Sequence, residues 1–357
     1  MIDSERLLAS FRRLLSISSP SGQEQEVAAY LVEQLRALGI ACEVDSAGNV
    51  LGRTDGRGEP LLLCAHMDTV EPTDALHVVE RDGLICSDGS TILGADDKAG
   101  IAVALEAVQS ARAHPPLDIV FTVREEVGLL GAAALDLNWL RARRGICLDA
   151  GGPIGTLVTS APSHDRLEAK VIGRAAHAGA SPENGINAIA VAAEAITRMR
   201  LGRIDPETTA NIGIIRGGVA TNIVPDLVEL VGEARSHNED TLRAQIQAMR
   251  QALESAAAEA GARVEINISR NYTRFSIPDD NPLVASMLAV ARERGYQAQA
   301  IAGGGGSDAN VFNAAGMQTF NMSVGMNAAH CKDENIAVKD LVQASEFLTA
   351  TLERLAG

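Results

Sequence analysis

Short apolar runs that end in acidic or imidazole side chains constrain the fold of this chain more than any other feature. The runs and their ends are 61–65 followed by His66, 119–123 followed by Arg124, Glu125 and Glu126, and 146–148 followed by Asp149. Apolar runs without alternation are typical of strands that are covered on both faces. Because ligands of open α/β sheets bind just beyond the carboxyl ends of the strands, we expect these polar groups to converge on one site.

The order of the predicted elements indicates two domains in a chain of 357 residues. Over 1–164 and 273–357, strand-like and helical patterns alternate, which predicts an α/β domain with a central sheet between helices. Residues 165–272 instead repeat strand, helix, strand twice, which predicts an inserted α+β domain of ferredoxin-like βαββαβ order. The insertion is indicated because a candidate ligand, His330, and a further strand at 319–324 lie beyond it.

Several helices and strands can be placed more closely. Apolar spacing predicts helices over 2–16, 98–112 and 338–355. Another helix is expected over 24–38, because Ser21 and Glu24 stand in the Ser-x-x-Glu spacing of a capping box. A single strand-like run is expected near 41–53.

Composition excludes several classes of partner. The formal charge of −15 would be repelled by nucleic acid and by an anionic membrane surface, and no cluster of Lys and Arg compensates for it. The N-terminus lacks the pattern of a signal peptide, and no segment reaches membrane-spanning length. These two observations predict a cytoplasmic protein, and in such a reducing compartment an odd count of five cysteines without a CxxC pair indicates free thiols.

The polar groups at the strand ends have the composition of a metal site. In an extended backbone, Asp68 can reach the His66 ring and orient it, although His-x-Asp alone is more often a strand-end histidine beside a solvated aspartate. Asp96 stands at the turn into a helix, where it could cap the helix or bridge two cations with its two oxygens. Glu125 and Glu126 point in different directions, so one can bind while the other transfers protons; a solvated pair is the alternative.

A count of candidate ligands supports two divalent ions, with one carboxylate shared so that each ion receives three protein ligands. The candidates are His66, Asp96, Glu126, Asp149 and His330. Mixed imidazole and carboxylate ligation without thiolate suits catalytic zinc, for which cobalt or manganese could substitute.

The motifs resemble, over nearly the whole chain, the dinuclear-zinc exopeptidase family that contains peptidase T, glutamate carboxypeptidase and succinyl-diaminopimelate desuccinylase. The motifs are Cys64–Val70, Gly94–Gly100, Glu125–Gly128, Leu148-Asp149, Ala176–Gly179 and His330. The peptidase T-like branch is the most similar, on Leu93–Gly100, Ala175–Gly185 and Gly305–Asn310.

The resemblance implies a role for each motif residue. His66 and Asp149 would hold one zinc ion, Glu126 and His330 the other, and Asp96 would bridge them. Glu125 would be the general base for a metal-bridging water. The family also has a cis peptide after the bridging aspartate, so we expect one between Asp96 and Asp97.

The resemblance further implies that the inserted domain is a lid that also forms a homodimer. His177 would donate a hydrogen bond to the substrate carbonyl or the oxyanion, often across the dimer interface; a solvent-facing loop histidine is the alternative. Asn222 and Arg235 match positions that contact substrate, although a turn residue and a surface arginine would explain them equally well. Gly305, Gly306 and Ser307 lack the ending of a phosphate loop but could hold a peptide carboxylate, with turn glycines as the alternative.

The favoured function is an aminopeptidase of the tripeptidase type that acts on short peptides. A carboxypeptidase or an N-acyl amino acid deacylase could use the same metal centre, because all of them cleave an amide with water. A non-catalytic metal- or peptide-binding protein is less favoured, since simple metal binding would not require Glu125 and Asp68.

Overall fold

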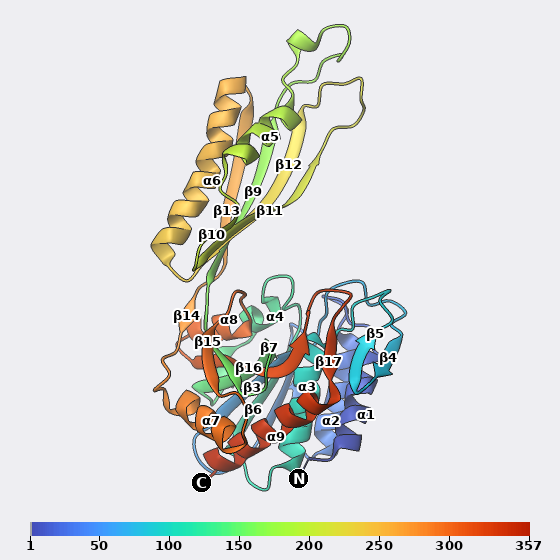
Figure 1. Cartoon of the computed structure of the whole chain (residues 1–357), viewed down its shortest axis with the longest axis vertical. Helices are drawn as coiled ribbons and strands as arrows, with labels where there is room; N and C mark the ends of the chain where they lie inside the picture. Colours follow the sequence, from blue (N-terminus) through green and yellow to red (C-terminus); the bar gives the residue numbers. More distant parts are fainter. Residues whose placement is uncertain (1) are drawn as a thin grey trace. The chain divides into compact units, whose positions relative to one another are not determined.

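The structure is a computed structural model that describes residues 2–357, and it divides into two compact units (Figure 1). The first unit extends to Ala161 and resumes at Phe275, and the second comprises Pro162–Arg274. The second unit therefore begins three residues before the expected residue 165 and ends two residues after residue 272.

The first unit is built on a twelve-stranded mixed sheet. Its four central strands run parallel, in the order β6 (Leu117–Thr122), β3 (Leu61–His66), β7 (Arg144–Gly151) and β16 (Gln318–Asn327). Antiparallel strands flank them: β2 (Val50–Thr54) and β1 (Ala41–Val44) beyond β6, and β17 (Asn335–Ala337), β5 (Leu84–Ser87) and β4 (Val78–Arg81) beyond β16. A branch from β16 holds β8 (Thr156–Ala161), β14 (Phe275–Ser276) and β15 (Gln299–Ala302).

Helices cover this sheet, and every residue of β3 and β6 is buried. The helices α1 (Ser4–Leu15) and α9 (Val338–Leu355) pack on α3 (Ala95–Ser110), which lies against β3 and β7. The other helices of this unit are α2 (Gln25–Ala37), α4 (Leu130–Ala134), α7 (Pro282–Glu293) and α8 (Asp308–Ala314), with a 3-10 turn at Leu137–Trp139. The predicted class, an α/β domain with a central sheet between helices, is confirmed.

Two local predictions for the first unit are wrong. The run 41–53 is not one strand, because Asp45 accepts hydrogen bonds from the amides of Ala47, Gly48 and Asn49 and folds the chain into the hairpin of β1 and β2. The capping box is also absent. Among the residues that the structure describes, no side chain caps α2. The Ser21 hydroxyl donates to Asp68 instead, and Glu24 accepts from the amides of Gly22 and the distant Arg124.

The second unit is a five-stranded antiparallel sheet with helices on one face (Figure 1). The strand order is β10 (Gly202–Asp205), β11 (Thr208–Gly217), β12 (Leu227–Ser236), β9 (Ser163–Ile172) and β13 (Arg263–Tyr272). The helices α5 (Ala188–Arg198) and α6 (Glu239–Ala260) cover the apolar face, and a 3-10 turn lies at Pro182–Asn184. The predicted βαββαβ order is present, with β10 as an additional edge strand. Within residues 2–357, no helix is both long and apolar enough to cross a membrane.

Candidate metal centre

The carboxyl ends of the central parallel strands bring the predicted polar groups to one edge of the sheet. His66 is the last residue of β3, Glu125 and Glu126 follow the end of β6, and Asp149 lies near the end of β7. Cys64 pairs with Cys147 on one side and with Val120 on the other, so these three strand ends lie at one level. The parallel arrangement thus places side chains that are far apart in sequence side by side.

The start of α3 supplies the next carboxylates. Asp96 and Asp97 have non-helical backbone angles, Gly94 before them is left-handed with φ of 74°, and the peptide bond between Asp96 and Asp97 is cis, as predicted. A Cβ on Gly100 would lie 2.2 Å from Asp97 Oδ1 and 2.6 Å from the carbonyl oxygen of Leu148. Only a glycine permits this close approach of α3 to the end of β7.

Asp96 lies between two imidazoles, one on each of its oxygens. His66 Nε2 lies 3.1 Å from Asp96 Oδ1, whereas His330 Nε2 lies 3.3 Å from Asp96 Oδ2. His330 Nε2 also lies 2.7 Å from Glu126 Oε1. Ligand atoms of His66, Asp96 and Glu126 all lie within 4.8 Å of one another, so these residues form a group that could hold a metal ion.

The charges of the cluster also fit a divalent cation. Burial raises the pKa of Glu125 and of Asp149 well above the ordinary values, and neighbouring carboxylates raise both further. Contact with Asp96, and then with Glu126, raises the pKa of His330 to about 10. Without a cation, the raised pKa values favour the protonated forms of Glu125 and Asp149 and the charged form of His330. A divalent ion would remove this repulsion and stabilise the ionised carboxylates and neutral imidazoles that serve as ligands.

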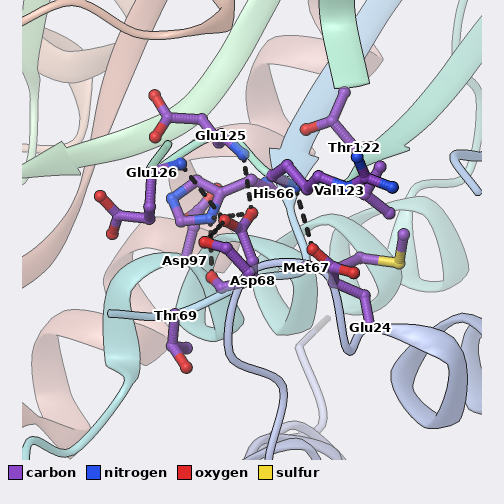
Figure 2. A network of polar contacts seen from close by, with 12 residues as sticks. Glu24, His66, Met67, Asp68, Thr69, Asp97, Thr122, Val123, Glu125 and Glu126 are labelled. Atoms are coloured by element: carbon purple, nitrogen blue, oxygen red, sulfur yellow. Dashed lines mark hydrogen bonds and ion pairs between the residues drawn. The ribbon is translucent and has the colours of Figure 1, made fainter. Parts of the chain in front are cut away.

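Asp68 links the histidine to the glutamate loop (Figure 2). Its Oδ1 accepts a hydrogen bond from the Glu125 amide at 2.9 Å, and its Oδ2 accepts from the Glu126 amide at 3.2 Å and from the Ser21 hydroxyl at 2.6 Å. The Asp68 carboxylate lies 3.5 Å from His66 Nδ1, whereas the Asp68 carbonyl oxygen lies 2.9 Å from that nitrogen. Asp68 thus contacts the ring mainly through its carbonyl, and its carboxylate holds two backbone amides.

Two buried residues at the site have no counterpart among the predicted residues. Glu334 is fully buried and accepts hydrogen bonds from the amides of Gly94, at 2.7 Å, and Asp96, at 3.0 Å. Lys98 is buried in the first regular turn of α3 and donates to the carbonyl of Ile17 at 2.6 Å. Burial lowers the pKa of Lys98 to about 8. The only sequence signal for Glu334 is its position four residues after His330.

Three predicted residues belong to the second unit. His177 is exposed, and its Nδ1 accepts hydrogen bonds from the amides of Gly179 and Ala180 at 3.1 and 3.0 Å. In the neutral ring the proton is therefore on Nε2, which can donate. Asn222 lies beside this loop, because its carbonyl accepts from the Ala178 amide at 2.9 Å.

Arg235, the third of these residues, lies on β12 and is paired within its own strand. Its Nε donates to Glu233 Oε1 at 2.9 Å, and its second guanidinium nitrogen donates to Oε2 at 3.1 Å. A substrate carboxylate at Arg235 would have to share the guanidinium with Glu233 or displace it.

The glycine loop leads into α8. Gly305 is exposed and Gly306 is half-buried, whereas Ser307 is buried and caps α8 in a capping box with Asn310. The Ser307 hydroxyl also contacts the side chain of Asn321 at 2.9 to 3.1 Å. Its side chain therefore serves the local structure, and the glycine amides are the accessible part of the loop.

The fold and this cluster together define a metal-dependent hydrolase. Residues 62–354 match the peptidase family M20/M25/M40, and the chain belongs to this family. The resemblance predicted from the motifs is thereby confirmed.

Two solved structures and one curated protein are similar to the whole chain. A tripeptidase from Staphylococcus aureus is 38% identical, with a TM-score of 0.93 over 100% of this chain and 99% of that one. The aminopeptidase PepT from Bacillus cereus ATCC 10987 is 37% identical, with a TM-score of 0.87 over 100% of both chains. The uncharacterized protein YqjE of Bacillus subtilis is 38% identical over 370 residues, which span 100% of both.

Proposed function

We propose that this protein is a di-zinc aminopeptidase of the tripeptidase type, which hydrolyses the N-terminal peptide bond of short peptides. The observation that carries the proposal is the position of Asp96, whose two oxygens face two different imidazoles beside the buried Glu125. Similarity along the full chain to a tripeptidase and to an aminopeptidase supports the same substrate class.

The five proposed ligands divide around Asp96. His66 and Asp149 would hold one ion, Glu126 and His330 the other, and Asp96 would contact both. Two divalent ions bound there would polarise the scissile carbonyl and lower the pKa of a water molecule. Zinc is the proposed metal because the group lacks thiolates and combines imidazoles with carboxylates; cobalt and manganese also suit such ligands.

Glu125 is proposed as the general base. Its side chain is only 8% exposed, and it stands next to Glu126 but outside the group of His66, Asp96 and Glu126. Its carboxylate would accept a proton from the attacking water and deliver that proton to the leaving amine. Asp68 would support this step, because it holds the Glu125 amide.

The remaining predicted residues are proposed to bind the substrate. Nε2 of His177 would donate a hydrogen bond to the carbonyl as it gains negative charge. Asn222 and Arg235 would contact the peptide, and the loop of Gly305, Gly306 and Ser307 would offer amides to a carboxylate.

A homodimer formed through the second unit is proposed as well. Six of the large apolar side chains that are exposed lie in this unit, namely Ile189, Ile214, Ile215, Val219, Ile223 and Leu227. Apolar groups of this kind are typical of interaction surfaces. A mass measurement in solution tests the proposal, which requires twice the 37.4 kDa of one chain. The five free cysteines support a reducing compartment such as the cytoplasm.

A substrate panel with metal analysis tests the activity. The zinc-loaded protein should release the first residue of a tripeptide, and acetylation of the substrate's amino group should abolish cleavage. Undiminished cleavage of acetylated tripeptides would contradict the aminopeptidase proposal. Release of the last residue would instead indicate a carboxypeptidase, and preference for N-acyl amino acids would indicate a deacylase.

A further inference from the structure

We propose that Glu24, in the turn before α2, is a positioning residue for Glu125; this inference rests on the proposed role of Glu125 as general base. Glu24 is only 3% exposed. Its Oε1 accepts hydrogen bonds from the amide of Gly22 at 2.7 Å and from the amide of Arg124 at 3.0 Å. Arg124 directly precedes Glu125, so a carboxylate one hundred residues away in sequence fixes the entry to the glutamate loop.

The backbone at Arg124 explains why such a restraint is needed. Its φ is 53°, in the left-handed region that side-chain-bearing residues rarely adopt. The Arg124 side chain is exposed, so its packing does not select this conformation. A left-handed residue persists only where surrounding contacts hold it, and the hydrogen bond to Glu24 is such a contact.

Two buried carboxylates accept hydrogen bonds from different backbone amides of the glutamate loop. Glu24 accepts from Arg124, while Asp68 accepts from Glu125 and Glu126, so three successive amides are held. The turn that holds Glu24 also contacts Asp68, because the Ser21 hydroxyl donates a hydrogen bond to the Asp68 carboxylate at 2.6 Å. The residues that sequence spacing assigns to a helix cap thus support the glutamate loop.

Because Glu24 and Asp68 hold different amides of the loop, proton transfer and metal binding should respond differently to the loss of Glu24. Loss of the Glu24 carboxylate would leave the Arg124 amide, in the peptide unit between Val123 and Arg124, without its acceptor, and the left-handed backbone that leads into Glu125 would lose this restraint. Glu126 would remain held by Asp68 and would keep its 2.7 Å contact with His330. Removal of Glu24 should therefore impair proton transfer while metal binding is retained.

The experiment compares Glu24→Ala, Glu24→Gln, Glu125→Gln and the double variant Glu24→Ala/Glu125→Gln in the zinc-loaded protein with a tripeptide. We expect Glu24→Ala to lower kcat by about tenfold to a hundredfold, with KM changed by less than about twofold, because small displacements of reacting groups cost rate. The metal content should equal that of the wild type. Glu24→Gln should recover most of the activity, since its amide oxygen accepts the same two bonds.

The double variant separates positioning from a general structural role. If Glu24 acts through Glu125, its removal adds no further loss of kcat in the Glu125→Gln background. Asp118→Ala is the matched control, because Asp118 is a buried carboxylate on β6 that accepts two amides, from Arg141 and Ala142, at 2.6 and 2.9 Å. This control should lower Tm and leave kcat unchanged.

Three results would overturn the inference: wild-type kcat in Glu24→Ala, an equal further loss in the double variant, or loss of metal from Glu24→Ala. If Glu24→Ala does not fold, Glu24→Asp carries the same test, because the shorter side chain withdraws from the Arg124 amide and keeps its charge. Full turnover in Glu125→Gln contradicts the proposed function itself, whereas an inactive Glu125→Gln beside an unaffected Glu24→Ala contradicts only the positioning role.

Discussion

Replacement of Gly100 by alanine should destabilise the protein, although alanine is the better helix former. A Cβ there would lie 2.2 Å from Asp97 Oδ1 and 2.6 Å from the Leu148 carbonyl oxygen. Alanine gains about 1 kcal/mol of helix propensity over glycine. Overpacking costs about 1 to 3 kcal/mol of stability. We expect a cost at or above the upper end of this range, because the Leu148 carbonyl is backbone and the Asp97 side chain is fully buried, so neither can move aside easily.

The expected net loss is about 2 kcal/mol, which corresponds to a Tm lower by about 4 to 8 °C in a unit of this size. Thermal unfolding of the metal-free protein, followed by circular dichroism, measures this loss. Gly213→Ala is the control, because the nearest atom to its added Cβ is 3.6 Å away and its stability should change by less than about 0.5 kcal/mol. A Tm for Gly100→Ala at or above the wild-type value would refute the steric argument.

Three further predictions concern the metal site and the second unit. Glu334→Ala should cost about 2 to 5 kcal/mol and lower metal occupancy, because the buried amides of Gly94 and Asp96 lose their acceptor. The His164 contact lowers the pKa of Glu233 to about 2 from an ordinary 4.5, so its stabilisation is present above pH 4.5 and lost as the pH falls toward 2. The free energy of unfolding of the wild type decreases as the pH is lowered, and Glu233→Gln should reduce this decrease by about 1 kcal/mol after allowance for solvent screening. Chelation should lower Tm, since metal at a hundred times its Kd stabilises by about 2.7 kcal/mol.

Each of these three predictions has its own control or its own contradicting result. Glu334→Gln keeps an acceptor oxygen and should lose less stability than Glu334→Ala; equal losses would show that the two amide bonds do not matter. For Glu233, urea unfolding from pH 6 to pH 2.5 gives the two curves, and parallel curves would contradict a contribution of the Glu233 carboxylate to the pH dependence of stability. For chelation, an unchanged Tm in the Asp96→Asn variant is the control, and an unchanged Tm in the wild type would contradict stabilisation by metal.

The fold and the ligand cluster could be predicted because they depend on local patterns. Buried parallel strands are apolar throughout, so the runs that end at His66 and before Glu125 mark both the sheet and its functional edge. The insertion followed from the position of His330 beyond a second repeat of strand, helix and strand. Spacing alone did not indicate which side chains bind each metal ion and which one transfers the proton. The family motifs suggested those roles.

The supporting residues could not be predicted in this way, because their partners are distant in sequence. Glu334 binds amides about 240 residues away, and Glu24 binds one that is 100 residues away. The local spacing of Ser21 and Glu24 instead favoured a helix cap, which long-range hydrogen bonds override. The edge strand β10 was missed because four residues containing one glycine carry little periodic signal.

Metal content and tripeptide turnover of Glu125→Gln, measured on the same preparation, test the central claim most directly. The account predicts that the variant binds as much zinc as the wild type and hydrolyses the peptide at least about a hundredfold more slowly, as expected on loss of a general base. Turnover at the wild-type rate with both metal ions bound would contradict it.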